Sequence, residues 1–144
     1  MKFSYLLLFN LLVTHLYSQE VISFKSSNPF GFRDVITNLE NLQDQEVEAI
    51  LKLPKGKGPF PLIIGVAGSL DWGPHHLEYL QMFRESRMAT LELQSFSSRG
   101  VKSTVGSQIE VTTATMVLDA YRALDKISTH PDIDKDRVAI MGWS

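Results

Sequence analysis

The sequence has 144 residues, of which 44% are hydrophobic and 21% are charged, which is enough for one small domain with its own core. Its 14 basic and 16 acidic residues give a net charge of -2, and this near-balance argues against a protein that binds nucleic acid through phosphate contacts. The absence of cysteine excludes disulfide scaffolds, thiol nucleophiles and cysteine-ligated metal sites, and the four histidines show no metal-ligand spacing.

The first eighteen residues have the pattern of a secretory signal peptide. Met1-Lys2 gives a short positive start, residues 6–16 are almost wholly apolar, and small and polar residues follow. The apolar run has about eleven residues, against the roughly 20 that span a bilayer, so a permanent membrane anchor is the weaker interpretation. A buried N-terminal helix is the structural alternative. We expect cleavage after Ser18 and a secreted or periplasmic protein that begins at residue 19.

The next part of the sequence predicts four strands. Residues 21–24 and 32–39 are expected as short strands, the first of them at a sheet edge. Residues 46–53 alternate charged and apolar side chains, which is the period of a half-buried strand. Residues 60–67 form a continuous apolar run, typical of a central parallel strand that is covered on both faces.

Helices and strands then alternate. A glycine-rich loop at 68–74 precedes a predicted helix at 75–87 and a strand at 88–93. The longest helical signal covers 106–128, and a last apolar strand is expected at 137–142. Apolar residues in the long helix recur at three- and four-residue steps and are expected to face the core: Ile109, Thr113, Met116, Val117, Ala120, Tyr121, Leu124 and Ile127. This order predicts an α/β fold with a mostly parallel sheet layered by helices.

The last three residues carry the strongest chemical signal. Gly142-Trp143-Ser144 follows an apolar strand and forms the first half of the G-x-S-x-G pattern. In that pattern a sharp strand-to-helix turn exposes the serine hydroxyl at the edge of the sheet. Ser144 is therefore the candidate nucleophile, and a serine that simply follows a strand is the alternative.

The loop after residues 60–67 is a candidate oxyanion site. A tetrahedral oxyanion needs preorganised donors, and backbone N–H groups of this loop can supply one. Gly68 would let the backbone approach a substrate closely. The N–H of Ser69 is the first candidate donor, and that of Leu70 is the second.

Several blocks of the sequence together resemble one family. They are 58–64, Gly68-Ser69, Ser95-Phe96-Ser97-Ser98-Arg99-Gly100, 119–124, 130–134 and 137–144. From about residue 24 onward the chain is similar to the dienelactone hydrolase family of α/β-hydrolases. The resemblance implies an esterase-like fold with a serine nucleophile, an acid and a histidine, and Ser144 matches the nucleophile. Ala67 stands where the family usually has histidine, and Gln94 stands where it usually has aspartate.

The order of catalytic groups in this fold is serine, then acid, then histidine. None of His75, His76, Asp119, Asp132, Asp134 or Asp136 fits that order, so both partners of Ser144 are expected beyond residue 144. We therefore interpret residues 19–144 as the N-terminal part of a truncated α/β-hydrolase domain. This piece is expected to be inactive alone, because a serine without a base keeps its proton. Its strand at 138–141 is expected to be an open apolar edge.

Three further residues are candidates for contacts with the substrate. Leu70 and Trp72 lie in the loop beside the expected oxyanion site, and packing at the base of the loop is an equal alternative for Trp72. Arg99 could bind a substrate carboxylate, although a structural ion pair is the more common role of a loop arginine. Asp119 is expected to make a structural bond.

The function that follows is hydrolysis of a carboxylic ester or lactone through an acyl-enzyme in the full-length protein. We expect a small-molecule substrate, no nucleic acid, no permanent membrane anchor, and no metal or organic cofactor. Peptidase, thioesterase or acyltransferase chemistry on the same fold is one alternative. A secreted binding module without catalysis is the other. The sequence carries no signal for an oligomeric state.

Overall fold

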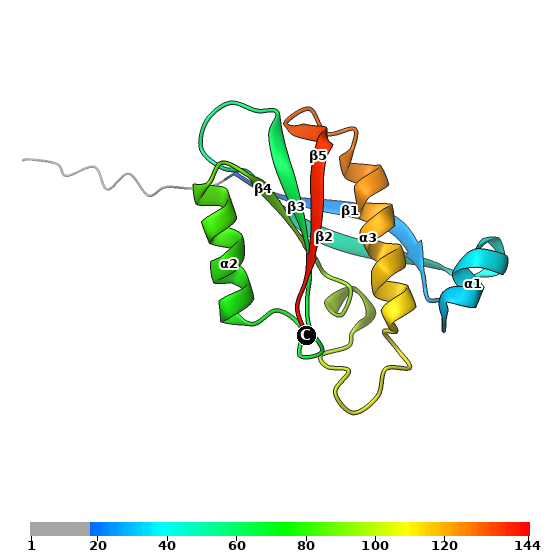
Figure 1. The fold of residues 1–144 in the computed structure, drawn as a ribbon. Helices are drawn as coiled ribbons and strands as arrows, with labels where there is room; N and C mark the ends of the chain where they lie inside the picture. Colours follow the sequence, from blue (N-terminus) through cyan, green and yellow to red (C-terminus); the bar gives the residue numbers. More distant parts are fainter. Residues whose placement is uncertain (1–17) are drawn as a thin grey trace, which may run out of the picture.

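The computed structural model describes residues 18–144 (Figure 1), so the expected signal peptide lies outside the described residues except for Ser18. The order of elements agrees with the predicted alternation of strands and helices. The strands are β1 (Gln19–Ser27), β2 (Asp44–Lys52), β3 (Phe60–Val66), β4 (Ala89–Leu93) and β5 (Ile133–Gly142). The helices are α1 (Phe32–Thr37), α2 (Pro74–Glu85) and α3 (Thr113–Ile127), with short 3-10 turns η1 (Leu39–Asn41) and η2 (Ser97–Arg99).

The strands form one mixed sheet in the order β1-β2-β4-β3-β5. β3 pairs in parallel with β4 on one side and β5 on the other, as the helical connections predict. β1 and β2 add to β4 in antiparallel fashion and extend the sheet away from β5. The central position predicted for residues 60–67 is thus confirmed, and so is the edge position of the first strand.

The core lies between the sheet and α3. In β2 the alternating residues Val47, Ala49 and Leu51 are completely buried, as the period-2 pattern predicts. α3 packs mainly against β1 and also against β3, and its small residues Ala120 and Ala123 belong to the same buried cluster. Figure 1 shows α2 on the opposite side of the sheet, so the sheet has one helix on each face.

The prediction of a strand at residues 32–39 is wrong. The chain forms α1 and the turn η1 there. The Asp34 carboxylate accepts hydrogen bonds from the amides of Phe30 and Gly31 at 2.9 and 3.0 Å, which satisfies donors at the start of the helix. The local bonding of Asp34 therefore outweighs the strand preference of the neighbouring apolar residues.

The long helix is shorter than predicted, and its buried face is rotated. α3 begins after Thr112, whose hydroxyl accepts a hydrogen bond from the Thr115 amide at 3.1 Å. Ile109 therefore lies outside the helix and is exposed. Val117 and Tyr121 are also exposed, so the expectation that they belong to the core is wrong. The face toward the sheet is instead rich in small residues, which let the helix approach closely.

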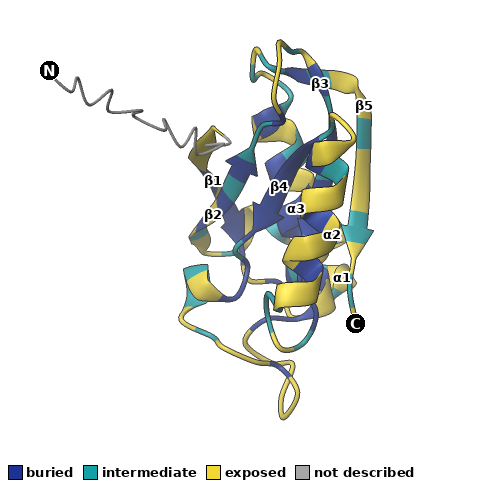
Figure 2. Ribbon diagram, turned by 90° about the vertical axis from the view of Figure 1, so that its left-hand side faces the viewer, coloured by how far each residue is buried: buried dark blue, intermediate teal, exposed yellow. Residues whose placement is uncertain are grey.

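β5 forms one edge of the sheet in the described part of the chain. It pairs with β3 only, and in Figure 2 most of it is coloured as exposed, whereas β4 is coloured as buried. Ile140 is about half exposed, which agrees with the open apolar edge expected there. Among residues 18–144, no helix has both the length and the apolar character needed to cross a membrane.

Candidate active site

The parallel pairing of β3 and β5 brings two loops together at one edge of the sheet. Gly142 pairs with Val66, and the Trp143 amide donates a hydrogen bond to the Val66 carbonyl at 3.2 Å. Ser144 is two residues further on and is therefore level with Gly68. A Cβ atom at Gly68 would lie 3.2 Å from the carbonyl carbon of Ser144, so the two backbones are in close contact. The absence of a side chain at Gly68 permits this approach.

The loop that faces Ser144 is held in a tight turn. The Asp71 amide donates a hydrogen bond to the Gly68 carbonyl at 2.9 Å, and Asp71 has a left-handed backbone with a φ of 62°. Aspartate tolerates this conformation better than most residues. The Ser69 carbonyl accepts a hydrogen bond from the Thr104 amide at 2.8 Å, which ties the turn to the loop between β4 and α3. The backbone of the candidate oxyanion loop is thus fixed from two directions.

A pocket of about 330 Å³ lies between this loop, the start of α2 and Ser144. Ser144 itself is exposed. The pocket therefore contains the candidate nucleophile, the candidate donor Ser69 and one candidate substrate contact, Leu70. Its lining residues are Gly68, Ser69, Leu70, Asp71, Gly73, His75, His76, Val105 and Ser144.

Trp72 packs beneath the pocket and does not line it. Its indole N–H donates to the Leu93 carbonyl at 2.8 Å, and its ring lies edge-on to Trp143 with centroids 5.6 Å apart. The ring also covers Gly65, where a Cβ atom would be only 2.8 Å from it. This geometry favours the packing alternative for Trp72, since the ring joins β3, β4 and the end of β5.

Arg99 does not line the pocket, and its guanidinium donates hydrogen bonds to other protein groups. Its guanidinium binds both carboxylate oxygens of Asp119, at 2.8 and 2.9 Å. It also donates to the carbonyls of Ser95 and Ser27 and to the side chain of Asn28. The Arg99 side chain is 4% exposed and that of Asp119 is 0% exposed. This placement favours the structural ion pair over a contact with substrate.

Both histidines at the start of α2, His75 and His76, line the same pocket as Ser144. The sequence alone does not indicate this. His76 is buried against Trp143, with ring centroids 5.0 Å apart, and its Nδ1 accepts a hydrogen bond from the Gly73 amide at 3.1 Å. Burial lowers the pKa of His76, and the neighbouring charge of His75 lowers it further. His76 is therefore a buried residue in the first turn of α2. Its contact with Trp143 is non-local, and no spacing in the sequence signals it.

Asp71 is the other group that sequence reasoning missed. Its Oδ1 atom is buried and has no hydrogen-bond partner among the described residues. Burial raises the pKa of the Asp71 carboxyl, and a bond from the Trp72 amide partly opposes that effect. No group of three or more metal-ligating side chains occurs within residues 18–144.

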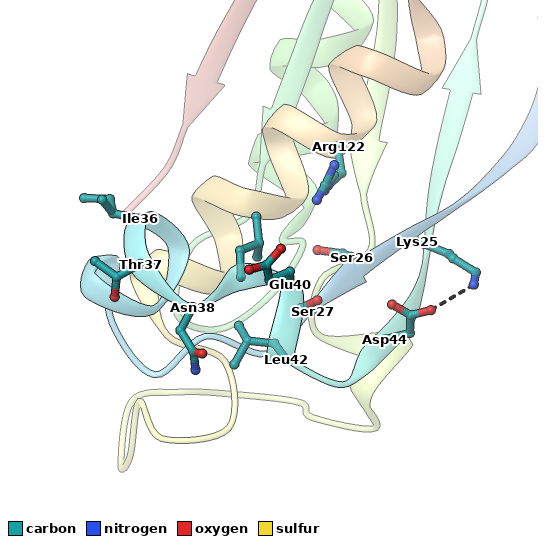
Figure 3. Close-up of a pocket in the computed structure, with 11 residues that line it drawn as sticks. Lys25, Ser26, Ser27, Ile36, Thr37, Asn38, Glu40, Leu42, Asp44 and Arg122 are labelled. Atoms are coloured by element: carbon teal, nitrogen blue, oxygen red, sulfur yellow. Dashed lines mark hydrogen bonds and ion pairs between the residues drawn. The ribbon is translucent and has the colours of Figure 1, made fainter.

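A larger pocket of about 550 Å³ lies between β1, the segment around η1 and α3 (Figure 3). Its charged groups have both signs, namely Lys25, Glu40, Asp44 and Arg122, and Lys25 pairs with Asp44 at 2.8 Å. The Ser26 hydroxyl in this pocket is buried, and the Asp119 carboxylate to which it donates is already paired with Arg99. This pocket is therefore a weaker candidate for catalysis than the one at Ser144.

Comparison with known proteins yields structures but no close relatives. No family model matches the sequence, and no curated protein matches it. A Klebsiella pneumoniae protein assigned to the dienelactone hydrolases matches with a TM-score of 0.57 at 16% identity, over 86% of this chain and 50% of that chain. A dienelactone hydrolase from Anabaena variabilis matches with a TM-score of 0.53 at 14% identity, over 86% of this chain and 52% of that chain.

A structure of an esterase matches with a TM-score of 0.52 at 12% identity, over 86% of this chain and 34% of that chain. At these identities the similarity establishes a shared fold. The chain spans about half the length of the dienelactone hydrolase structures that it matches.

Proposed function

Because residues 18–144 have the α/β-hydrolase fold of the dienelactone hydrolase structures over about half of their length, we propose that the protein is a serine hydrolase that cleaves carboxylic esters or lactones. The observation that carries this proposal is the contact between Ser144, at the end of β5, and the Gly68 turn, at the end of β3. Ligands bind at the carboxyl ends of parallel strands in open α/β sheets, and both groups are there.

In the proposed reaction the Ser144 oxygen attacks the carbonyl carbon of the ester. The negative charge that develops on the carbonyl oxygen is stabilised by the Ser69 N–H, with the Leu70 N–H as the second candidate. The ester C–O bond breaks, the alcohol leaves with the serine proton, and a water molecule then releases the acid from the acyl-enzyme. The proton-transferring histidine and its acid belong, in this proposal, to the part of the protein beyond residue 144.

The rival chemistries keep the same nucleophile. Cleavage of a thioester or peptide, or transfer of the acyl group to an acceptor other than water, would use the same attack by Ser144. A binding module without catalysis would keep the pocket and lose the later histidine and acid. We also propose that residues 1–18 direct export and that the mature protein is secreted or periplasmic.

A fluorophosphonate probe on the full-length protein tests the proposal. The probe forms a covalent bond with an activated serine, so the wild type should be labelled and the Ser144→Ala variant should not. Ser97→Ala is a matched control, because Ser97 is an exposed serine outside the pocket. Equal labelling of the wild type and Ser144→Ala, or no labelling of either, would refute the proposal. The 144-residue chain alone should hydrolyse p-nitrophenyl esters no faster than its own Ser144→Ala form.

A further inference from the structure

The pocket at Ser144 has a one-sided charge. Among the described residues that line it, Asp71 is the one carboxylate, and none is a lysine or an arginine. The other titratable side chains there are His75 and His76, and burial lowers the pKa of His76, which disfavours its cationic form. The carboxyl group of Asp71 is therefore faced by no lysine or arginine in this part of the pocket.

The arginine that could reverse this charge is not free to do so. Arg99 forms its paired contact with Asp119 and has three further acceptors, which use the donors on both sides of its guanidinium. Because both partners are almost completely buried, moving Arg99 into the pocket would leave the Asp119 carboxylate unpaired in the core. A substrate carboxylate thus meets no lysine or arginine side chain among the described residues of this site.

Asp71 is held firmly at the pocket wall. Its amide is bonded to Gly68, its backbone is left-handed, and its Oδ1 atom is buried without a partner. A carboxylate in a partly buried pocket wall attracts a cationic group and repels a second anion. The rim beside it is apolar, since Leu70 is 74% exposed and Val105 is 69% exposed.

From this geometry we propose that the pocket selects esters whose acyl part is uncharged or cationic and rejects esters that carry a carboxylate, with Asp71 as the residue that determines this specificity. The apolar part of such an ester would lie against Leu70 and Val105. The inference rests on the proposed ester hydrolysis and names the substrate class of the same site.

The test uses three p-nitrophenyl esters of similar length on the full-length protein. Their acyl chains are pentanoate, which is neutral, glutarate, which ends in a carboxylate, and 4-(trimethylammonio)butanoate, which is cationic. The kcat/KM of the wild type should be at least about tenfold lower for the glutarate ester than for the neutral ester, which is a difference of about 1.4 kcal/mol. The cationic ester should be hydrolysed at least as well as the neutral one.

Asp71→Asn keeps the size and the left-handed backbone while it removes the charge. It should bring the glutarate and neutral esters to within about threefold of each other. Asp125→Asn removes one exposed carboxylate outside the pocket and should leave the tenfold ratio unchanged.

The outcomes separate this inference from the proposed function. Equal or faster hydrolysis of the glutarate ester by the wild type overturns the inference while it supports ester hydrolysis, and this result needs no variant to fold. An unchanged ratio in a folded Asp71→Asn protein overturns the role of Asp71. If no ester is hydrolysed in a manner that depends on Ser144, the proposed function fails and the inference fails with it.

Discussion

Removing the Asp119 carboxylate is expected to destabilise the fold more than any change at the surface. Asp119 is completely buried, and it pairs through both oxygens with Arg99 and accepts a hydrogen bond from Ser26. The Asp119→Ala variant would leave the Arg99 guanidinium charged and unpaired in the core. Breaking a buried pair in this way costs about 3–5 kcal/mol. For a domain of this size that corresponds to a fall in Tm of roughly 10–20 °C.

The measurement is urea unfolding of the wild type and the variant, followed by circular dichroism, with thermal unfolding as a second probe. Asp44→Ala is the matched control, because it breaks the Lys25–Asp44 pair, whose side chains are 74% and 68% exposed. That exposed pair should contribute almost nothing to the free energy of unfolding.

A double variant isolates the cause of the loss. Arg99→Met combined with Asp119→Leu removes both charges, so it should recover part of the stability that Asp119→Ala loses. The recovery should be incomplete, because the carbonyl of Ser95 would lose its donor. If the free energy of unfolding of Asp119→Ala lies within about 1 kcal/mol of the wild-type value, the argument that Arg99 has a structural role is refuted.

Three further predictions concern the pocket and its surroundings. Gly65→Ala would place a Cβ atom 2.8 Å from the Trp72 ring, so we expect a loss of about 1–3 kcal/mol in urea unfolding, and an unchanged midpoint would contradict it. Gly68→Ala would press on the backbone of Ser144 at 3.2 Å, so fluorophosphonate labelling should slow severalfold while the circular dichroism spectrum stays native. Because burial raises the pKa of Asp71, the folded protein takes up this proton at a higher pH than the unfolded chain, and the carboxylate destabilises the fold at neutral pH. The free energy of unfolding of Asp71→Asn should therefore exceed that of the wild type at pH 7. This difference should shrink as the pH falls through the raised pKa of Asp71. A lower free energy of unfolding for the variant at pH 7 would contradict the reasoning.

The parts of the fold that could be predicted from the sequence have strong local signals. The apolar run of β3 and the alternating pattern of β2 fix both the type of element and its buried residues. The parallel arrangement of β3, β4 and β5 follows from the helical connections α2 and α3, and it brings Ser144 to the Gly68 loop. These inferences depend on short stretches of sequence and on general rules of topology.

The parts that could not be predicted depend on contacts between distant segments. The apolar pattern of α3 includes both Ala120, which is buried, and Tyr121, which is exposed, and only the packing of the helix on the sheet separates them. The buried state of His76 depends on Trp143, which is far away in the chain. The pairing of Arg99 with Asp119 also joins a loop to a helix, and neither residue type reveals its partner.

The register between β3 and β5 limits where the length of this chain can change. Gly142 is opposite Val66, and side chains alternate between the faces of a strand with a period of two. A deletion of one residue from β5 would move Trp143 to the far face and carry Ser144 away from Gly68. Insertions and deletions within β5 should therefore abolish the proposed hydrolysis, whereas an insertion at the exposed Thr129, in the turn before β5, should leave this register unchanged.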